Sequence, residues 1–262
     1  MPSVGDGTCH DGVMGWVFDL DGVIWRGDDP IAGSAHAIAT LLAAHAEVLF
    51  VTNMSALPVA EVEAKLARHG IDGRGRVVTS ALAAASLVAA GERVLLCGGP
   101  GVRDALEARG AIVVTDGAAD AVVVGYHPEF DYARMTAAAQ AVWGGARLIG
   151  TNDDPTYPTA TGLVPGGGAI LASIVTATGS AAQVAGKPYA PIADLVRHRL
   201  GSTGVMVGDR ADTDGAFARA LGYRFALVLT GVTTRRDLPV QPEPDLVAAD
   251  AAEVVRQLVG LL

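Results

Sequence analysis

Short apolar runs alternate with longer segments of helical periodicity along most of this chain. A continuous apolar run at 14–18 predicts a buried strand, and the apolar spacing at 34–44 predicts a helix after it. The same alternation reaches the C-terminus, where a closing helix is expected at 251–261. Alternating strands and helices favour a mostly parallel sheet with right-handed crossovers. The sequence therefore predicts an α/β fold.

The pattern between these two ends predicts the remaining elements. Strands are expected at 48–51, 77–79, 93–96, 111–114, 121–124, 147–150, 183–185, 205–207, 225–229 and 245–248. Helices are expected at 58–69, 81–90, 102–109, 132–143, 169–178, 191–200 and 213–221. Proline and glycine residues between 155 and 168 predict a long loop. Ser34 and Ser80 are expected to cap the helices that they precede.

The middle of the chain continues the α/β pattern and has enough apolar positions to bury its own core. We therefore expect a Rossmann-like core from residues 13–80 and 183–262, with an α/β cap domain inserted at 81–182. Residues 1–12 are expected to form an N-terminal arm. The fold class predicted is thus a parallel-sheet core that carries an inserted α/β domain.

Composition narrows the functional classes. Half of the 262 residues are hydrophobic, but the sequence has no apolar run of 18 residues, so a membrane span is not expected. A net charge of −9 without a block of lysine or arginine argues against nucleic acid as the main partner. The two cysteines, Cys9 and Cys97, make neither a disulfide framework nor a metal site. With no apolar signal segment at the N-terminus, a cytoplasmic location is expected.

Polar side chains follow four of the predicted strands. These side chains belong to Asp19 and Asp21, Thr52 and Asn53, Lys187, and Asp209 and Asp214. Because the carboxyl ends of parallel strands meet at one edge of a sheet, the four groups are expected to converge there. Carboxylates around one lysine and one hydroxyl suit a divalent cation and a phosphate, and oxygen ligands favour Mg²⁺.

Electrostatics explains why a phosphate site would need these cations. A carboxylate within about 3.5 Å of a phosphate oxygen costs roughly 5 kcal/mol at an effective dielectric constant near 20. A nucleophilic aspartate therefore needs Mg²⁺ and a cation such as Lys187 before it can attack a phosphate dianion. Gly22, directly after Asp21, lets the chain turn sharply and leaves main-chain amides free to approach the anion.

Four motifs together resemble the haloacid dehalogenase-like superfamily. They are D-L-D-G-V-I-W at 19–25, V-T-N at 51–53, G-K-P at 186–188 and G-D-R-A-D-T-D at 208–214. The glycine-rich segment at 162–169 resembles the α/β (C2-type) cap of subfamily IIA. That subfamily includes 4-nitrophenyl phosphatases and phosphatases for pyridoxal phosphate, phosphoglycolate and glycerol phosphate. The resemblance covers residues 13–234.

The resemblance implies a role for each motif residue. Asp19 would be the nucleophile that forms an aspartyl-phosphate, and Asp21 would be the general acid and then the general base. The phosphoryl group would be bound by Leu20, Asp21, Thr52, Asn53 and Lys187. Mg²⁺ would be bound by Asp19, Asp209, Asp214 and the main-chain carbonyl of Asp21. The implied reaction is Mg²⁺-dependent hydrolysis of a small phosphorylated metabolite.

Three further residues are candidates for substrate contacts. Trp25 follows Asp21 in the same loop, and His127 lies in the predicted cap. Met54 stands where relatives usually have a second asparagine after T-N. Since caps of this kind often contribute dimer contacts, the resemblance also suggests a homodimer.

Two alternatives to the phosphatase remain open. A phosphotransferase or mutase would use the same aspartyl-phosphate with an acceptor other than water. A metabolite-binding member of the fold without catalysis would not need Asp21, whose presence argues against it. A dehalogenase is disfavoured because a departing halide needs no proton from an acid such as Asp21.

Overall fold

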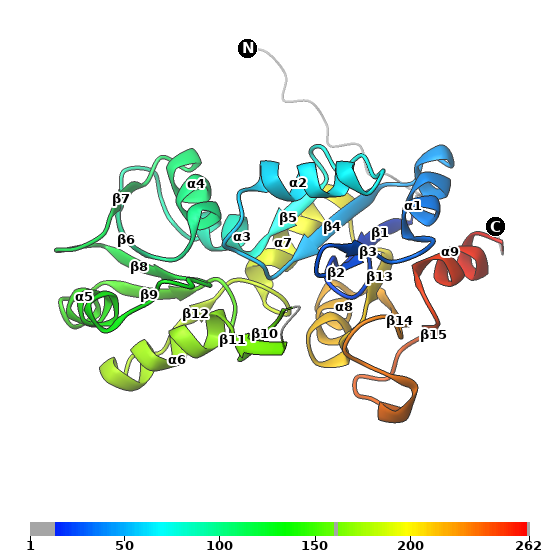
Figure 1. The fold of residues 1–262 in the computed structure, drawn as a ribbon. Helices are drawn as coiled ribbons and strands as arrows, with labels where there is room; N and C mark the ends of the chain where they lie inside the picture. The colour runs from blue at the N-terminus through cyan, green and yellow to red at the C-terminus, as the bar shows by residue number, and fades with distance from the viewer. Residues whose placement is uncertain (1–13, 160–161, 261–262) are drawn as a thin grey trace, which may run out of the picture.

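The chain forms two parallel sheets that lie next to one another (Figure 1). The computed structural model describes residues 14–159 and 162–260, and every structural statement below refers to them. The larger sheet has the strand order β15-β14-β13-β1-β4-β5, and all of its neighbouring strands are parallel. Its strands are β1 (Gly15–Phe18), β4 (Val48–Thr52), β5 (Val77–Thr79), β13 (Gly204–Gly208), β14 (Arg224–Val228) and β15 (Leu246–Ala248).

The smaller sheet is also parallel, with the order β12-β9-β8-β6-β7. Its strands are β6 (Arg93–Cys97), β7 (Ile112–Val114), β8 (Ala121–Val124), β9 (Arg147–Gly150) and β12 (Gln183–Val184). Two short antiparallel hairpins complete the described strands: β2 (Trp25–Arg26) with β3 (Asp29–Pro30), and β10 (Thr156–Thr159) with β11 (Gly162–Pro165). The predicted α/β class is confirmed.

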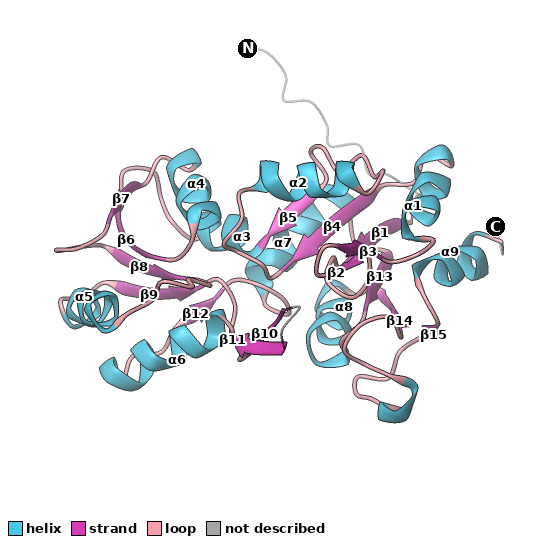
Figure 2. Ribbon diagram, in the orientation of Figure 1, coloured by secondary structure: helices cyan, strands magenta, loops and turns pink. Residues whose placement is uncertain are grey.

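Helices cover both faces of each sheet (Figure 2). α1 (Ser34–Ala43), α2 (Val59–Arg68) and α9 (Ala251–Val259) share a core with one face of the larger sheet. Its other face packs with α3 (Ser80–Ser86), α7 (Ala190–Leu200) and α8 (Ala216–Leu221), in a core that continues to α4 (Pro100–Ala108). α5 (Tyr132–Trp143) and α6 (Gly167–Thr178) cover the remaining face of the smaller sheet. A 3₁₀ turn, Arg235–Asp237, follows β14.

Strand β1 lies at the centre of the larger sheet and is buried on both faces. Trp16 and Phe18 stack at 6.0 Å between ring centroids and belong to one core, whereas Val17 belongs to the other. Burial on both faces explains why this strand reads as a continuous apolar run rather than as alternating positions. Burial of each large apolar side chain contributes roughly 1.5–3 kcal/mol to the free energy of folding. This strand therefore holds the polar residues that follow it in a fixed position.

The topology places a ligand site at the end of β1. The chain passes from β1 to β4 and β5 on one side, and later fills the other side with β13, β14 and β15. Strand order therefore reverses beside β1, and the crevice at such a reversal is where open α/β sheets bind ligands. Gly22 turns the chain there with φ +82°, and a Cβ at this position would lie 2.5 Å from a carboxylate oxygen of Asp209.

Both predicted serine caps are wrong. The cap of α1 is Gly33 in the left-handed region, and the Ser34 hydroxyl donates to the carbonyl of Val23 at 2.9 Å instead. The cap of α3 is Thr79, whose Oγ1 accepts from the amide of Leu82 at 3.2 Å. Each serine is instead the first residue of its helix, so the N-cap is the residue before it.

The structure also corrects three expectations for the inserted region. The loop expected at 155–168 contains the β10–β11 hairpin, whose strands are too short for a periodic signal. The strand at 183–184 pairs with β9 in the smaller sheet, so the expected boundary at 183 falls inside that sheet. Trp143, whose apolar side chain predicts a place in a core, is 63% exposed at the end of α5. Residues 1–12 and Cys9 lie outside the described residues.

Two findings on composition follow from the described residues. None of their helices combines the length and the apolar character that crossing a membrane requires. Cys97 is buried and forms no disulfide, and burial raises its pKa to about 11, so its thiol is not a reactive nucleophile at neutral pH.

Burial in the core predicts a difference between two leucine substitutions. Leu41 in α1 is 1% exposed, whereas Leu163 in β11 is 72% exposed. We expect Leu41→Ala to lower the free energy of unfolding by about 2–5 kcal/mol, because it leaves a cavity. Leu163→Ala should change it by less than about 0.5 kcal/mol. Urea unfolding of both variants checks this, and equal effects would contradict the assignment of the core.

Candidate active site

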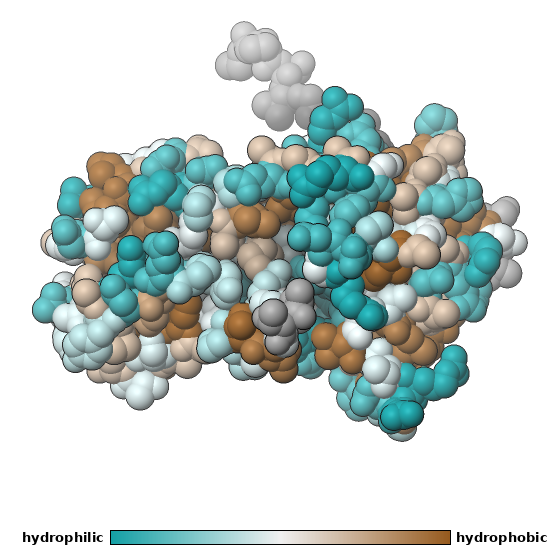
Figure 3. All heavy atoms as spheres, viewed as in Figure 1, coloured by the Kyte–Doolittle hydropathy of each residue, from teal (hydrophilic) through white to brown (hydrophobic). Residues whose placement is uncertain are grey.

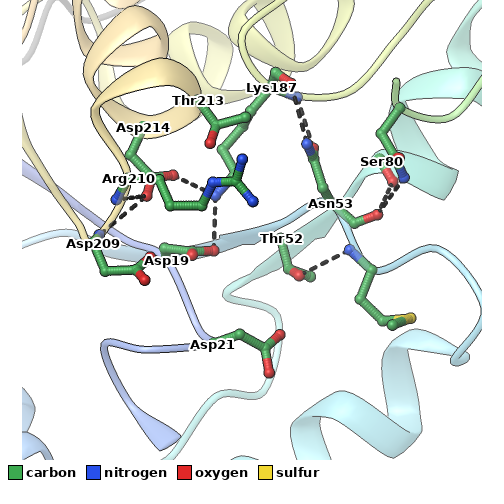
Figure 4. Close-up of polar contacts among 12 residues, drawn as sticks. Asp19, Asp21, Thr52, Asn53, Ser80, Lys187, Asp209, Arg210, Thr213 and Asp214 are labelled. Atoms are coloured by element: carbon green, nitrogen blue, oxygen red, sulfur yellow. Dashed lines mark hydrogen bonds and ion pairs between the residues drawn. The ribbon is translucent and has the colours of Figure 1, made fainter. Parts of the chain in front are cut away.

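The ammonium group of Lys187 joins two carboxylates from distant parts of the chain (Figure 4). Its Nζ lies 2.7 Å from Oδ1 of Asp19 and 2.7 Å from Oδ1 of Asp214. Asp19 follows β1, Lys187 follows β12, and Asp214 lies in a π-helical turn after β13. All three side chains are buried. The predicted convergence of these strand ends is therefore observed for Asp19, Lys187 and Asp214.

The loop after β13 brings Asp209 into the same group. The second oxygen of Asp214 accepts hydrogen bonds from the amides of Asp209, at 3.1 Å, and Arg210, at 3.2 Å. Asp209 Oδ2 accepts from the amide of Val232, which lies in the loop after β14. The close approach requires Gly208, because a Cβ there would lie 2.3 Å from the Cβ of Asp214. Main-chain amides thus orient both carboxylates.

Burial and mutual repulsion perturb these carboxylates. Burial raises the pKa of Asp19 well above its ordinary value, Asp214 and Asp209 add to this, and Lys187 opposes it. Burial and the charge of Asp214 raise the pKa of Asp209 to about 7. Burial opposes the charge of Lys187, but Asp19 and Asp214 outweigh it and hold the pKa of the ammonium above its ordinary value. One ammonium therefore does not neutralise the group.

The three carboxylates fit a divalent metal ion. One oxygen atom each from Asp19, Asp209 and Asp214 lie within 4.8 Å of one another, and all three residues are buried. Oxygen donors at this spacing suit a hard cation such as Mg²⁺ or Ca²⁺. A cation would also compensate the negative charge that raises the pKa values in its absence. The residues present thus fit a metal, and the buried aspartate triad is a candidate metal centre.

Hydrogen-bond donors without partners lie beside this centre. Thr52 is 3% exposed at the end of β4 and lines the cavity, and its Oγ1 accepts from the amide of Met54 at 3.0 Å. Among the described residues no acceptor is found for the Thr52 hydroxyl hydrogen or for the amides of Leu20 and Asp21. Such donors at a strand end can bind an anion, as the sequence predicts for these three residues.

The side chain of Asn53 is held by protein partners. Its Oδ1 accepts from the amide of Lys187 at 2.8 Å, and its Nδ2 donates to the carbonyl of Lys187 at 3.1 Å and to Asp154 at 2.9 Å. The carbonyl of Asn53 in turn accepts from Ser80 and Asn152, both at 2.8 Å. The side-chain amide of Asn53 therefore holds the Lys187 loop. Asn53 also lines the cavity, and among the described residues no acceptor is found for its main-chain amide, so the phosphate contact stays a prediction for that amide.

Asp21 lies in the cavity but outside the carboxylate group. Burial raises its pKa, while a hydrogen bond from Trp25 and the charges of Lys65 and Lys187 oppose the rise. The indole Nε1 of Trp25 donates to Oδ1 of Asp21 at 3.0 Å. Trp25 is 4% exposed and is not part of the cavity wall. The structure therefore places Trp25 behind Asp21, not at the entrance where a substrate contact was expected.

Both sheets contribute to one cavity of about 600 Å³. Asp19, Asp21, Thr52, Met54 and Asp209 line it from the larger sheet. The side of the smaller sheet supplies Tyr126, Asn152, Asp154, Thr156 and Tyr157. Figure 3 shows hydrophobic surface in the region of the β10–β11 hairpin. Met54 is thus at the cavity, as predicted, and the cavity reaches well beyond the carboxylates.

Sequence reasoning missed the contribution of the loop after β9. Thr151 to Asp154 follow an apolar strand, which is the same signal that identified the other polar groups. Asn152 and Asp154 both line the cavity and bind Asn53. Because β9 was expected in the inserted domain, its end was not expected to meet the strand ends of the core sheet.

His127 is not part of this cavity. It lines a separate pocket of about 350 Å³ with Gly98, Arg103 and Arg134, and its Nδ1 accepts from the amide of Glu129 at 3.3 Å. A substrate contact from His127 has no support in this position. Arg210 lines the main cavity and forms an ion pair with Asp212 at 2.8 Å.

Comparison with known proteins agrees with this geometry. A family model described as haloacid dehalogenase-like hydrolase matches residues 16–112, and one described as HAD-hydrolase-like matches residues 184–254. An acid sugar phosphatase of Staphylococcus haemolyticus is 38% identical over 231 residues, which cover 86% of this chain and 88% of that protein.

Two solved structures share the fold. The magnesium complex of a glycerol phosphate phosphatase from Mycobacterium tuberculosis has a TM-score of 0.85 and 34% identity, covering 91% of this chain and 75% of that one. A 4-nitrophenylphosphatase from Thermotoga maritima has a TM-score of 0.87 and 31% identity, covering 93% and 97%. The chain therefore belongs to the haloacid dehalogenase-like hydrolases of subfamily IIA, and it is a phosphatase of small phosphoesters.

Proposed function

We propose that this protein is a Mg²⁺-dependent phosphatase that hydrolyses a small polyol phosphate through an aspartyl-phosphate on Asp19. The observation that carries the proposal is the contact of Lys187 with both Asp19 and Asp214 at the end of β1, where the strand order reverses. In this proposal the larger sheet forms the catalytic core and the smaller sheet forms the cap.

In the first step a carboxylate oxygen of Asp19 forms a bond to phosphorus while the bond from phosphorus to the leaving oxygen breaks. The proton of Asp21 passes to that oxygen, so the leaving group departs as a neutral alcohol. Lys187 orients Asp19 and offsets its charge against the phosphate. The hydroxyl of Thr52 and the amides of Leu20 and Asp21 are free to bind the phosphoryl oxygens.

In the second step water attacks phosphorus and the bond to Asp19 breaks, which releases phosphate. Asp21, now ionised, accepts the proton of the attacking water. A Mg²⁺ ion bound by Asp19, Asp209 and Asp214 would supply further neutralisation of the phosphate charge. Closure of the cap over the cavity would exclude bulk water and select the leaving group.

Carboxylates and phenol groups in the cavity wall favour a leaving group that has hydroxyl groups. The cavity is lined by the carboxylates of Asp28, Asp29 and Asp154 and by the arginines Arg26 and Arg210. The aromatic pair Tyr126 and Tyr157, with ring centroids 5.4 Å apart, also lines it. Carboxylates and phenol groups can bind hydroxyl groups, and the carboxylates would repel a second anion. Glycerol phosphate and sugar phosphates, which the names of the relatives include, have such leaving groups.

The proposal predicts that Asp19 is indispensable. Asp19→Asn should lower Mg²⁺-dependent phosphate release from 4-nitrophenyl phosphate by roughly 10³-fold or more. Acid quenching during turnover should trap a phosphorylated protein in the wild type and not in the variant. Asp194→Asn, at an exposed position of α7, is the control and should retain activity. Activity that survives in Asp19→Asn would refute the nucleophile, and phosphate transfer only to an added acceptor would favour a transferase.

The buried carboxylates predict a pH-dependent response to Mg²⁺. With a pKa of about 7 for Asp209 in the folded protein and an ordinary value of 3.8, only the unfolded chain loses this proton between these pH values. The free energy of unfolding of the metal-free protein should therefore fall as the pH rises through this interval, and the raised pKa of Asp19 acts in the same direction.

Mg²⁺ competes with these protons, so its stabilising effect should grow with pH. At about 100 times its dissociation constant, Mg²⁺ should raise the melting temperature by roughly 5–10 °C at pH 8 and by much less at pH 5. Differential scanning fluorimetry with and without EDTA measures this. In Asp209→Asn the Mg²⁺ response should be lost, and an equal response at both pH values would contradict the site.

The charge of the cavity predicts the order of substrates. We expect kcat/KM for glycerol phosphate to exceed that for phosphoglycolate, whose leaving group has a carboxylate, by about tenfold or more. The double variant Asp28→Asn, Asp29→Asn should reduce this ratio by about two- to fivefold, because both side chains are exposed and their charges are screened. Asp194→Asn, remote from the cavity, should leave the ratio unchanged. A preference for phosphoglycolate would refute the proposed substrate class.

A further inference from the structure

Trp25 occupies a fixed position directly behind the carboxyl group of Asp21. Its main-chain amide donates to the carbonyl of Leu20 at 3.2 Å, and its carbonyl accepts from the amide of Gly22 at 2.7 Å. The loop from Leu20 to Trp25 therefore closes on itself. Within this closed loop the indole Nε1 reaches back to Oδ1 of Asp21 at 3.0 Å.

Helix α2 and the residue after it hold the indole ring from outside the loop. The ammonium of Lys65 lies 4.4 Å from the centroid of the ring, which is within range of a cation–π interaction. The ring of His69 lies 5.8 Å from the same indole. Lys65 is itself tied to the carbonyl of Gly27 at 2.6 Å. With 4% of its surface exposed, Trp25 has little freedom to move.

The chemistry of the indole group determines how Asp21 can use its two oxygens. An indole N–H only donates, so Oδ1 of Asp21 must accept and cannot carry a proton toward Trp25. The carbonyl oxygen of a carboxyl group accepts better than its hydroxyl oxygen, so this hydrogen bond favours a proton on Oδ2. Since Asp21 lines the cavity and Trp25 does not, Oδ2 is the oxygen left for the substrate.

We propose that Trp25 is a positioning residue that directs Oδ2 of Asp21 to the leaving oxygen of the substrate. This inference rests on the proposed role of Asp21 as the general acid. In the step concerned, the Oδ2–H bond of Asp21 breaks as the bond between phosphorus and the leaving oxygen breaks, and the proton forms the new O–H bond of the alcohol. Trp25 itself exchanges no proton and touches no substrate atom.

The leaving group of the substrate separates this role from a structural one. Glycerol departs as an alkoxide unless it is protonated, whereas 4-nitrophenolate is stable without a proton. The value of kcat/KM reports the step up to formation of the aspartyl-phosphate. If Oδ2 of Asp21 is no longer directed at the leaving oxygen, kcat/KM for glycerol phosphate should fall, whereas kcat/KM for 4-nitrophenyl phosphate should hardly change. A substitution that distorts the whole site should lower both values.

We expect Trp25→Phe to lower kcat/KM for glycerol phosphate by about 10- to 100-fold and that for 4-nitrophenyl phosphate by less than about threefold. Trp16→Phe is the matched control, because Trp16 is also a buried tryptophan, 2% exposed, of the same core and does not contact Asp21. It should change both substrates by the same factor. Equal losses for the two substrates in Trp25→Phe would overturn the inference.

A second substitution covers the case in which Trp25→Phe does not fold. Benzothienylalanine introduced at position 25 keeps the bicyclic ring and lacks the N–H donor. It should reproduce the selective loss for glycerol phosphate at an unchanged melting temperature. Full activity of this variant toward both substrates would overturn the inference even if Trp25→Phe is unstable.

Asp21→Asn separates failure of this inference from failure of the proposed function. If Asp21 is the general acid, this variant loses more kcat/KM for glycerol phosphate than for 4-nitrophenyl phosphate. That result, combined with equal losses in Trp25→Phe, would reject the positioning role and retain the acid. Equal losses for both substrates in Asp21→Asn would reject the acid, and with it the role of Trp25.

Discussion

The ammonium of Lys187 between the carboxylates of Asp19 and Asp214 is the interaction on which the site depends. A buried charge is costly unless it is paired, and removing one partner of a buried pair leaves the other uncompensated. Here one ammonium faces Asp19, Asp214 and the neighbouring Asp209, so the group remains negative and draws in further positive charge. Burial and the charge of Asp214 raise the pKa of Asp209, and this excess of buried negative charge makes the three carboxylates a suitable site for a divalent cation.

The backbone around Lys187 is held as firmly as its side chain. Asn53 at the end of β4 binds both the amide and the carbonyl of Lys187, and it also binds Asp154 from the loop after β9. One side-chain amide thus connects the larger sheet, the Lys187 loop and the smaller sheet. Because these contacts are made within hydrogen-bond distance, a shift of the smaller sheet would be felt at Lys187. Asn53 therefore links the cavity wall of the smaller sheet to the charged group around Lys187.

Local patterns predicted most of the elements and several residues of the site. Strand β8 and helix α5 have the predicted bounds, because apolar periodicity marks buried surfaces wherever the chain folds. Asp19, Thr52, Lys187, Asp209 and Asp214 were predicted from polar residues at strand ends. The hairpin at 156–165 and the pairing of 183–184 were not, since both depend on a partner strand that is distant or too short for a periodic signal.

The sequence by itself determined the α/β architecture, the polar groups at the strand ends and, by resemblance, the phosphatase family. Only the tertiary structure decided which partner each polar side chain binds. In this structure the side-chain amide of Asn53 supports Lys187, Trp25 hydrogen-bonds to Asp21, and His127 lies in a separate pocket. The physical reason is that a strand end specifies where a side chain begins, whereas its hydrogen-bond partners come from segments far away in the chain.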